Sequence, residues 1–97
     1  AVQGYLDEAR VRQSPRREST HPKAIIVPHA GYVYSGPIAA SGYARLEPFR
    51  DTINRVILLG PSHYVPVRGL AACHADIFET PLGPIPIDNQ SIDKLLE

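Results

Sequence analysis

The chain has 97 residues, with ten basic and ten acidic side chains and one cysteine, Cys73. A chain of this length forms at most one domain, and its zero net charge gives no electrostatic footprint for nucleic acid or an anionic membrane. One cysteine excludes an intrachain disulfide and favours a reducing compartment, so we expect a cytoplasmic protein. No apolar run approaches the roughly 18–20 residues that span a bilayer.

The first element is an expected helix over residues 2–12, where Val2, Tyr5, Leu6 and Ala9 recur at helical spacing. Residues 13–22 are polar and contain two prolines, which predicts a surface loop. His21 belongs to this loop, and we expect it to be solvated.

Two apolar runs, residues 24–27 and 56–59, are each followed by a histidine, His29 and His63. A run that is apolar at every position favours a strand covered on both faces, as in parallel sheets. Residues 28–37 between the first run and the next helix predict a loop that contains two glycines.

The remaining elements follow from capping signals. Pro37 suits the first turn of a helix that extends to about Leu46, with Ser35 or Gly36 as its N-cap. Residues 69–73 are a candidate strand, residues 74–86 are rich in turn formers, and Asp88 is a candidate N-cap for a last helix.

Strands that alternate with helices predict an α/β domain, a layered α/β/α sheet built from βα units over residues 1–97. The chain contains no methionine, and both its ends fall within expected helices. We therefore expect a portion of a larger domain.

The two histidines are the main candidates for chemistry. Ligand sites in open α/β sheets lie beyond the carboxyl ends of the strands, so parallel strands would bring His29 and His63 to one edge. Two neutral imidazoles there would supply part of a site for iron, copper or zinc. The alternative is that each is an ordinary loop histidine, and sequence spacing alone leaves both interpretations open.

Other residues near the histidines are weaker candidates. Tyr32, Tyr34, Ser62 and Tyr64 are candidates to line a pocket, although tyrosines at loop boundaries also bury a ring and keep the hydroxyl in water. No glycine pattern matches a nucleotide fingerprint, so we expect no nucleotide cofactor. No catalytic residue can be assigned.

Four further residues are also weaker candidates for chemistry. Cys73 lies in an apolar run and is expected to be a buried small hydrophobe. His74 is either a third ligand or a solvent-facing residue at a strand end. Asp76 and Glu79 could bind metal or act as a base, and both also fit a surface turn.

The sequence resembles the Memo-like proteins (mediator of cell motility, also component B of the AmmeMemoRadiSam system). Three blocks carry the resemblance: Ile25-Ile26-Val27-Pro28-His29-Ala30-Gly31-Tyr32 with Tyr34-Ser35-Gly36, then Ile57-Leu58-Leu59-Gly60-Pro61-Ser62-His63, then Thr80-Pro81-Leu82-Gly83 with Ile87-Asp88. Family members are considerably longer, so the likeness implies an N-terminal portion of the family domain.

The resemblance implies a fold similar to that of the class III extradiol dioxygenases, which hold non-haem iron. It also implies a pocket lined by two histidines and a cysteine, and the histidines fall on His29 and His63. The family cysteine lies later in the sequence, so Cys73 does not take its role. The third ligand is therefore expected outside these 97 residues.

Three functions are consistent with this resemblance. The first is a metal-binding redox protein in which iron or copper is held by His29 and His63 and a small molecule occupies the open positions. The second is a non-catalytic adaptor that binds phosphorylated peptides in the same pocket, and the third is a dioxygenase-like or hydrolytic enzyme. The expected partner is a small molecule or a peptide, with no nucleic acid and no membrane. The oligomeric state is open.

Overall fold

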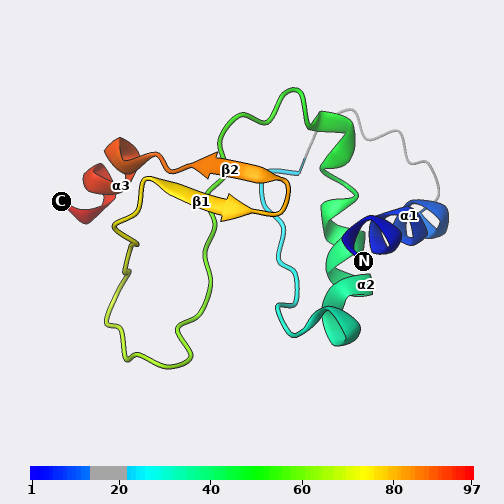
Figure 1. Ribbon diagram of the computed structural model, residues 1–97, viewed down its shortest axis with the longest axis horizontal. Coiled ribbons are helices and arrows are strands. Elements are labelled where there is room, and N and C mark those ends of the chain that lie inside the picture. Colours follow the sequence, from blue (N-terminus) through cyan, green and yellow to red (C-terminus); the bar gives the residue numbers. More distant parts are fainter. Residues whose placement is uncertain (14–21) are drawn as a thin grey trace. The chain divides into compact units, whose positions relative to one another are not determined.

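The computed structural model describes residues 1–13 and 22–97, in which helices and one β-hairpin form two units (Figure 1). In chain order the elements are α1 (Val2–Arg12), α2 (Tyr32–Tyr43), the 3-10 helix η1 (Glu47–Phe49), β1 (Ile77–Thr80), β2 (Gly83–Pro86) and α3 (Asn89–Leu96). The units are residues 1–58 and 59–97, and the prediction of a single domain stays a prediction. Most of the predicted polar loop, including His21, lies outside the described residues. None of the helices in the described ranges is long and apolar enough to cross a membrane.

Helix α1 confirms the helix predicted over residues 2–12, and it packs against α2 through small side chains. Ala9 of α1, Ala40 of α2 and the following Ala44 form the buried cluster, with Tyr5 and Leu6 partly buried against it. Because alanine adds little bulk beyond the backbone, the two helices can approach closely. The helix pair is therefore the core of residues 1–58.

Polar contacts from the C-terminal half of α1 reinforce this pair. Gln13 Nε2 donates to the carbonyl oxygen of Ser41 at 2.6 Å. Arg10 Nε donates to Glu47 Oε2 at 2.6 Å, and its Nη2 donates to the other carboxylate oxygen. Arg10 Nη1 also bonds Asp7 at 2.7 Å within α1. The Arg10–Glu47 fork therefore joins α1 to η1.

This fork predicts a loss of stability in acid. The hydrogen bonds from Arg10, aided by its charge, hold the pKa of Glu47 below its usual value, against a smaller opposing effect of burial. A lowered folded-state pKa stabilises the fold above the unfolded value of about 4.3, and this contribution is lost as the pH falls through the lower folded pKa. We expect the melting temperature, followed by circular dichroism, to fall below about pH 4, and less steeply in Glu47→Gln. Glu8→Gln, which removes an ion pair within α1, is the control, and an equal effect of both variants would contradict the prediction.

Helix α2 begins six residues earlier than the predicted start near Ile38. The predicted loop is therefore restricted to residues 28–31, and the predicted N-caps, Ser35 and Gly36, are wrong. Gly31 is the N-cap, and Pro37 lies inside the helix. The amides of Tyr34 and Ser35 already donate to the Gly31 carbonyl at 2.9 and 3.0 Å. Pro37 has no N–H, so it removes one bond of the helical ladder and does not mark the helix start.

The three predicted strands, residues 24–27, 56–59 and 69–73, are not strands in this structure. A strand is defined by hydrogen bonds to a neighbour, and in the described residues only β1 and β2 pair with one another. The described chain is thus a mixed helix and strand structure with a two-stranded antiparallel sheet, which is compatible with the α/β class. The layered α/β/α sheet is not formed by it.

The hairpin lies within residues 74–86, which the sequence predicted to be rich in turns. Its register pairs Ile77 with Pro86 and Thr80 with Gly83. Thr80 Oγ1 donates to the Gly83 carbonyl at 2.7 Å and accepts from the Leu82 amide at 3.2 Å, so one side chain fastens the turn.

Gly83→Ala is expected to open this hairpin. Gly83 has a φ of +122°, a conformation that costs a residue with a Cβ about 1–3 kcal/mol. An isolated hairpin is marginal even without this strain. Cross-strand nuclear Overhauser effects between Phe78 and Ile85 should weaken strongly, whereas Leu82→Ala at the exposed turn should leave them unchanged. Retention of the cross-strand signals in Gly83→Ala would refute the prediction.

Helix α3 confirms the predicted last helix and its cap. Asp88 Oδ1 accepts from the Ser91 amide at 3.1 Å, and Oδ2 accepts from the Ser91 hydroxyl at 2.7 Å. Asn89 Nδ2 donates to the Ala75 carbonyl at 3.1 Å and to Asp76 Oδ1 at 3.0 Å. The start of α3 is therefore tied to the segment that leads into β1.

Candidate functional site

The segment that carries His29 lies along α2. Burial alternates from residue 24 to residue 27, with Ile25 and Val27 half-buried and Ile26 fully exposed. A Cβ on Gly42 would lie 2.6 Å from Val27 Cγ1 and 3.9 Å from Ile25 Cδ1. The side chains of this segment therefore alternate between two faces, as they do in a strand. One face lies against Gly42 of α2, and the other face is in solvent.

A buried serine fixes the turn from His29 into α2. Ser35 is 6% exposed, and its hydroxyl donates to the Ala30 carbonyl at 2.7 Å. The prediction that Ser35 caps the helix is wrong, because Ser35 lies in the first turn and bonds backward to the residue after His29. His29 itself is exposed, so this turn presents its imidazole to solvent.

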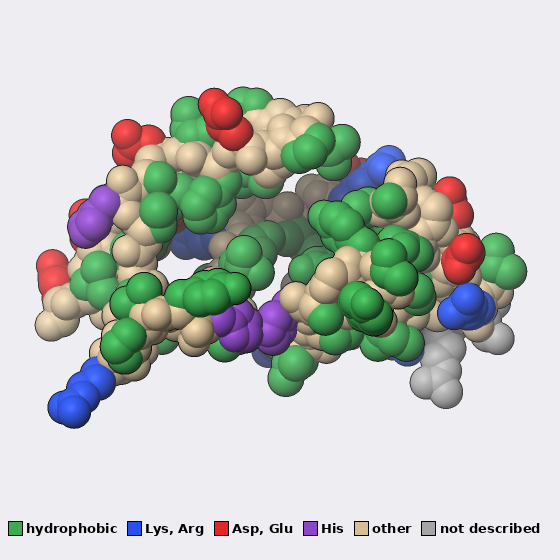
Figure 2. Space-filling view, turned by 60° about the horizontal axis from the view of Figure 1, so that its bottom comes forward, with side chains coloured by type: hydrophobic (Ala, Val, Ile, Leu, Met, Phe, Trp, Pro, Cys, Tyr) green, Lys and Arg blue, Asp and Glu red, His purple; other side chains and the backbone are tan. Residues whose placement is uncertain are grey.

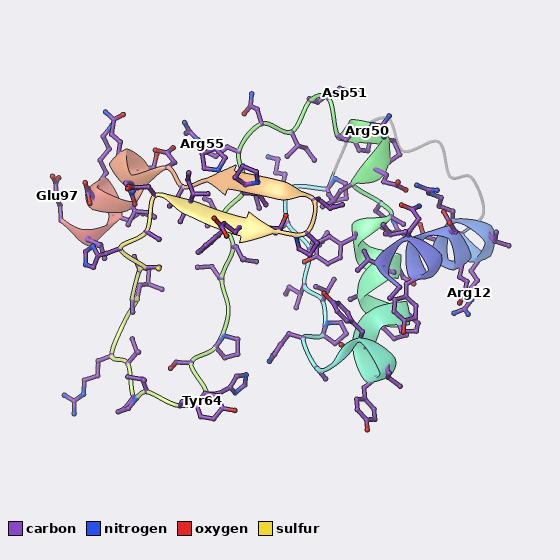
Figure 3. All side chains as sticks on the ribbon, viewed as in Figure 1. Arg12, Arg50, Asp51, Arg55, Tyr64 and Glu97 are labelled. Carbon is purple, nitrogen blue, oxygen red and sulfur yellow. The ribbon has the colours of Figure 1, made fainter. Side chains whose placement is uncertain are left out.

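His63 lies in a second turn, in the other unit. Ser62 donates its hydroxyl hydrogen to the Val65 carbonyl and so closes the turn around His63 and Tyr64. Both of these side chains are exposed, Tyr64 by 98%. Figure 3 shows Tyr64 at the far end of the loop that leads to β1.

The predicted site residues divide between the two units. His29, Tyr32 and Tyr34 belong to residues 1–58, and Ser62, His63 and Tyr64 belong to residues 59–97. Their convergence stays a prediction. Among the residues that the structure describes, no group of three His, Cys, Asp or Glu side chains is placed to hold a metal ion. A complete ligand set is therefore not found in the described part of this chain.

Of the predicted pocket-lining residues, Tyr32 does line a cavity, but one shared with α1. This apolar hollow of about 310 Å³ lies between the two helices of the first unit. Its lining residues are Val2, Tyr5, Leu6, Tyr32, Gly36, Ala39, Ala40 and Tyr43. The sequence did not single out Tyr5, whose ring is in contact with Gly36. The helical spacing of Tyr5 and Leu6 is the available signal, but such spacing indicates an apolar helix face and does not by itself indicate a cavity.

The other candidates are at the surface. Cys73 is exposed, so the prediction of a buried cysteine is wrong, because residues 69–73 do not form a covered strand. His74 is exposed as well. Asp76 accepts a hydrogen bond from Asn89, which gives it a structural contact, and Glu79 lies exposed in β1.

A family model decides the relationship of the chain to known proteins. The model described as "Memo-like protein" matches residues 2–97. The chain belongs to the Memo-like family. Because the match covers both histidine segments, it confirms the resemblance predicted from their motifs.

Curated relatives of this chain include a human protein and a protein of Aquifex aeolicus. The human protein MEMO1 is 37% identical over 94 residues, which are 97% of this chain and 29% of the relative. A MEMO1 family protein of Aquifex aeolicus is 41% identical over 81 residues, or 84% of this chain and 29% of the relative. The chain thus spans less than a third of the length of these relatives. No solved structure matches it.

Proposed function

We propose that this chain supplies two ligands, His29 and His63, to an iron or copper site of a Memo-like protein. The observation that carries the proposal is their repeated placement. Each histidine follows an apolar run and is exposed, and a serine hydroxyl closes the adjoining segment: His29 directly precedes the one closed by Ser35, and His63 lies within the one closed by Ser62. Exposed imidazoles held in defined turns can reach a metal without disrupting a core.

The side chains that this chain offers account for part of the ligand set of an iron or copper site. Imidazole is a good ligand for iron, copper and zinc, but two histidines leave the site short of a third protein ligand. No described group of three donors supplies it. The proposal therefore places the third ligand outside residues 1–97, where the family resemblance implies a cysteine thiolate, a ligand that copper and iron accept.

The fold proposed for the complete protein explains how two separate turns could form one site. Residues 24–27 and 56–59 would become neighbouring parallel strands of a layered sheet resembling that of the class III extradiol dioxygenases. Both turns would then lie beyond the carboxyl ends of the strands, where α/β folds place ligands. The covering of one face of residues 24–27 by α2, through Gly42 and Val27, supports this arrangement.

A bound metal would act as a Lewis acid or redox centre for a small molecule or a peptide group. In this chain the turns position the two imidazoles, and the phenol of Tyr64 beside His63 could donate a hydrogen bond to that ligand. Pro28 and Pro61 would stiffen the two approaches, because proline fixes φ near −65°.

The proposal can be tested on a chimera. These 97 residues would replace the matched stretch of the Aquifex aeolicus relative, so that the remaining family sequence is covalently present. Calorimetric titration with Fe(II) and with Cu(II) should give one metal ion per chimera, and the 97-residue chain alone should bind more weakly because it lacks a ligand. A chimera that takes up neither metal would overturn the proposal.

A further inference from the structure

The segment that carries His29 into α2 is held by little side-chain packing. Every residue from Pro28 to Tyr34 is exposed, and Ser35 is the first buried residue after them, with 6% of its surface exposed. Figure 2 shows histidine side chains, in purple, at the molecular surface. Because few buried contacts restrain an exposed segment, the geometry of this turn depends on its hydrogen bonds.

The hydrogen bonds of this turn come from the first turns of α2. The amides of Tyr34 and Ser35 donate to the Gly31 carbonyl, where the helical ladder begins. The Ser35 hydroxyl reaches one residue further back and donates to the Ala30 carbonyl at 2.7 Å, with a longer bond to the Gly31 carbonyl at 3.5 Å. A serine inside a helix ordinarily bonds the carbonyl four residues before it. Here the shorter bond goes five residues back, so the hydroxyl fixes the peptide group that directly follows His29 and Ala30.

The burial of Ser35 strengthens this bond. Water competes poorly for a buried hydroxyl, and a hydrogen bond in the low dielectric of an interior is electrostatically stronger than one in water. The next residue, Gly36, is buried as well and lies against the Tyr5 ring of α1. By contrast, Ser62 closes the turn around His63 but is exposed, so water competes for its hydroxyl. The turn after His29 therefore has the stronger side-chain tether of the two.

We infer that Ser35 is a positioning residue for His29: its hydroxyl holds the peptide group after the histidine and so sets how the imidazole is presented. The inference rests on the proposed function, in which His29 is a metal ligand. Restricting a ligand before the metal arrives lowers the conformational entropy that is lost on binding. Ser35 is not a ligand in this role, since it acts through the backbone.

The test uses the chimera described above and its Ser35→Ala variant. Alanine is a better helix former than serine, and the exposed Ala30 carbonyl can bond water in place of the hydroxyl, so α2 should keep its structure. Without metal, the order parameters of the Ala30 and Gly31 amides, from amide nitrogen relaxation, should fall from about 0.85 to about 0.6 or lower. With Fe(II) or Cu(II), calorimetric titration should give an affinity about tenfold lower, at the small end of the effect of losing a residue that orients a ligand.

Ser41→Ala is the matched control. Ser41 lies in the same helix, and its hydroxyl donates to the Pro37 carbonyl at 3.1 Å, within α2. Its loss should therefore change neither the order parameters at residues 30 and 31 nor the metal affinity.

Unchanged order parameters in Ser35→Ala would overturn the inference, and so would an equal effect of Ser41→Ala or a disordered turn in the parent chimera. If the parent binds metal and Ser35→Ala binds it equally well, the inference fails and the proposed function stands. If the turn loosens in Ser35→Ala but the parent binds no metal, only the proposed function fails, because Ser35 still holds the turn.

Discussion

A chimera that carries His29→Ala is expected to bind Fe(II) or Cu(II) at least about a hundredfold more weakly than the parent chimera, and His63→Ala should behave in the same way. Loss of a residue that only orients a metal ligand already costs about 10–100-fold in affinity. Loss of the ligand itself removes a metal–nitrogen bond and should exceed this range. Calorimetric titration of the two variants measures the effect directly.

Because both histidines are exposed, their alanine variants should change metal binding without changing the packing of the fold. The side chains of His29 and His63 are exposed, so their truncation to alanine opens no cavity in a packed core. His74→Ala, at another exposed histidine, controls for general loss of imidazole and should retain the affinity of the parent. Unchanged affinity in either the His29 or the His63 variant would remove that residue from the site.

Local signals in the sequence predicted local structure well. The helical spacing of Tyr5 and Leu6 and the capping carboxylate of Asp88 each correspond to a helix that forms within a few residues of its signal. These elements succeed because their hydrogen bonds close within the segment itself. Proline was the misleading local signal, since Pro37 suits a helix start but lies inside α2. The bonds at Gly31 and Ser35 set the true start.

Strands could not be predicted in the same way. The apolar run at residues 56–59 indicates side chains that avoid water, but a strand also requires a neighbour to satisfy its backbone. Conversely, Thr80 and Gly83 belong to a hairpin within a stretch that the sequence identified only as rich in turn formers. The hydrophobic pattern therefore indicated which segments avoid water, but it did not indicate which segments pair as strands.

For the candidate site too, the sequence indicated individual residues but not the contacts between distant parts of the chain. Motif and family resemblance pointed to His29 and His63, and the family match supports the alignment of both segments. The role of Ser35 in holding the turn after His29 was missed, because a serine two residues before Pro37 resembles a helix cap. Convergence of the two imidazoles depends on contacts between residues far apart in sequence, and no local pattern specifies such a distance.

Gly36→Ala is expected to destabilise the α1–α2 pair by about 1–2 kcal/mol, the balance of two effects. A Cβ at Gly36 would lie 2.7 Å from Cε2 and 2.9 Å from Cδ2 of Tyr5, and an aromatic ring cannot yield as a flexible side-chain tip does. Overpacking of this kind costs about 1–3 kcal/mol, whereas alanine in a helix interior gains about 0.5–1 kcal/mol over glycine. The packing loss should prevail, since this contact belongs to the small core of the first unit. Urea unfolding, followed by circular dichroism at the helix band near about 222 nm, gives the free energy of unfolding by linear extrapolation to zero denaturant.

Gly4→Ala provides a matched control with the opposite expected sign. Gly4 is also in a helix, but a Cβ there would meet nothing within 4 Å, so only the propensity gain of about 0.5–1 kcal/mol remains. In a double-mutant cycle, Tyr5→Ala should remove most of the cost of Gly36→Ala, because the ring that the new methyl group meets is gone. Stabilisation by Gly36→Ala, or a cost that persists without the Tyr5 ring, would show that this contact does not set the spacing of α1 and α2. The close approach of the helices would then rest on the buried cluster of Ala9, Ala40 and Ala44.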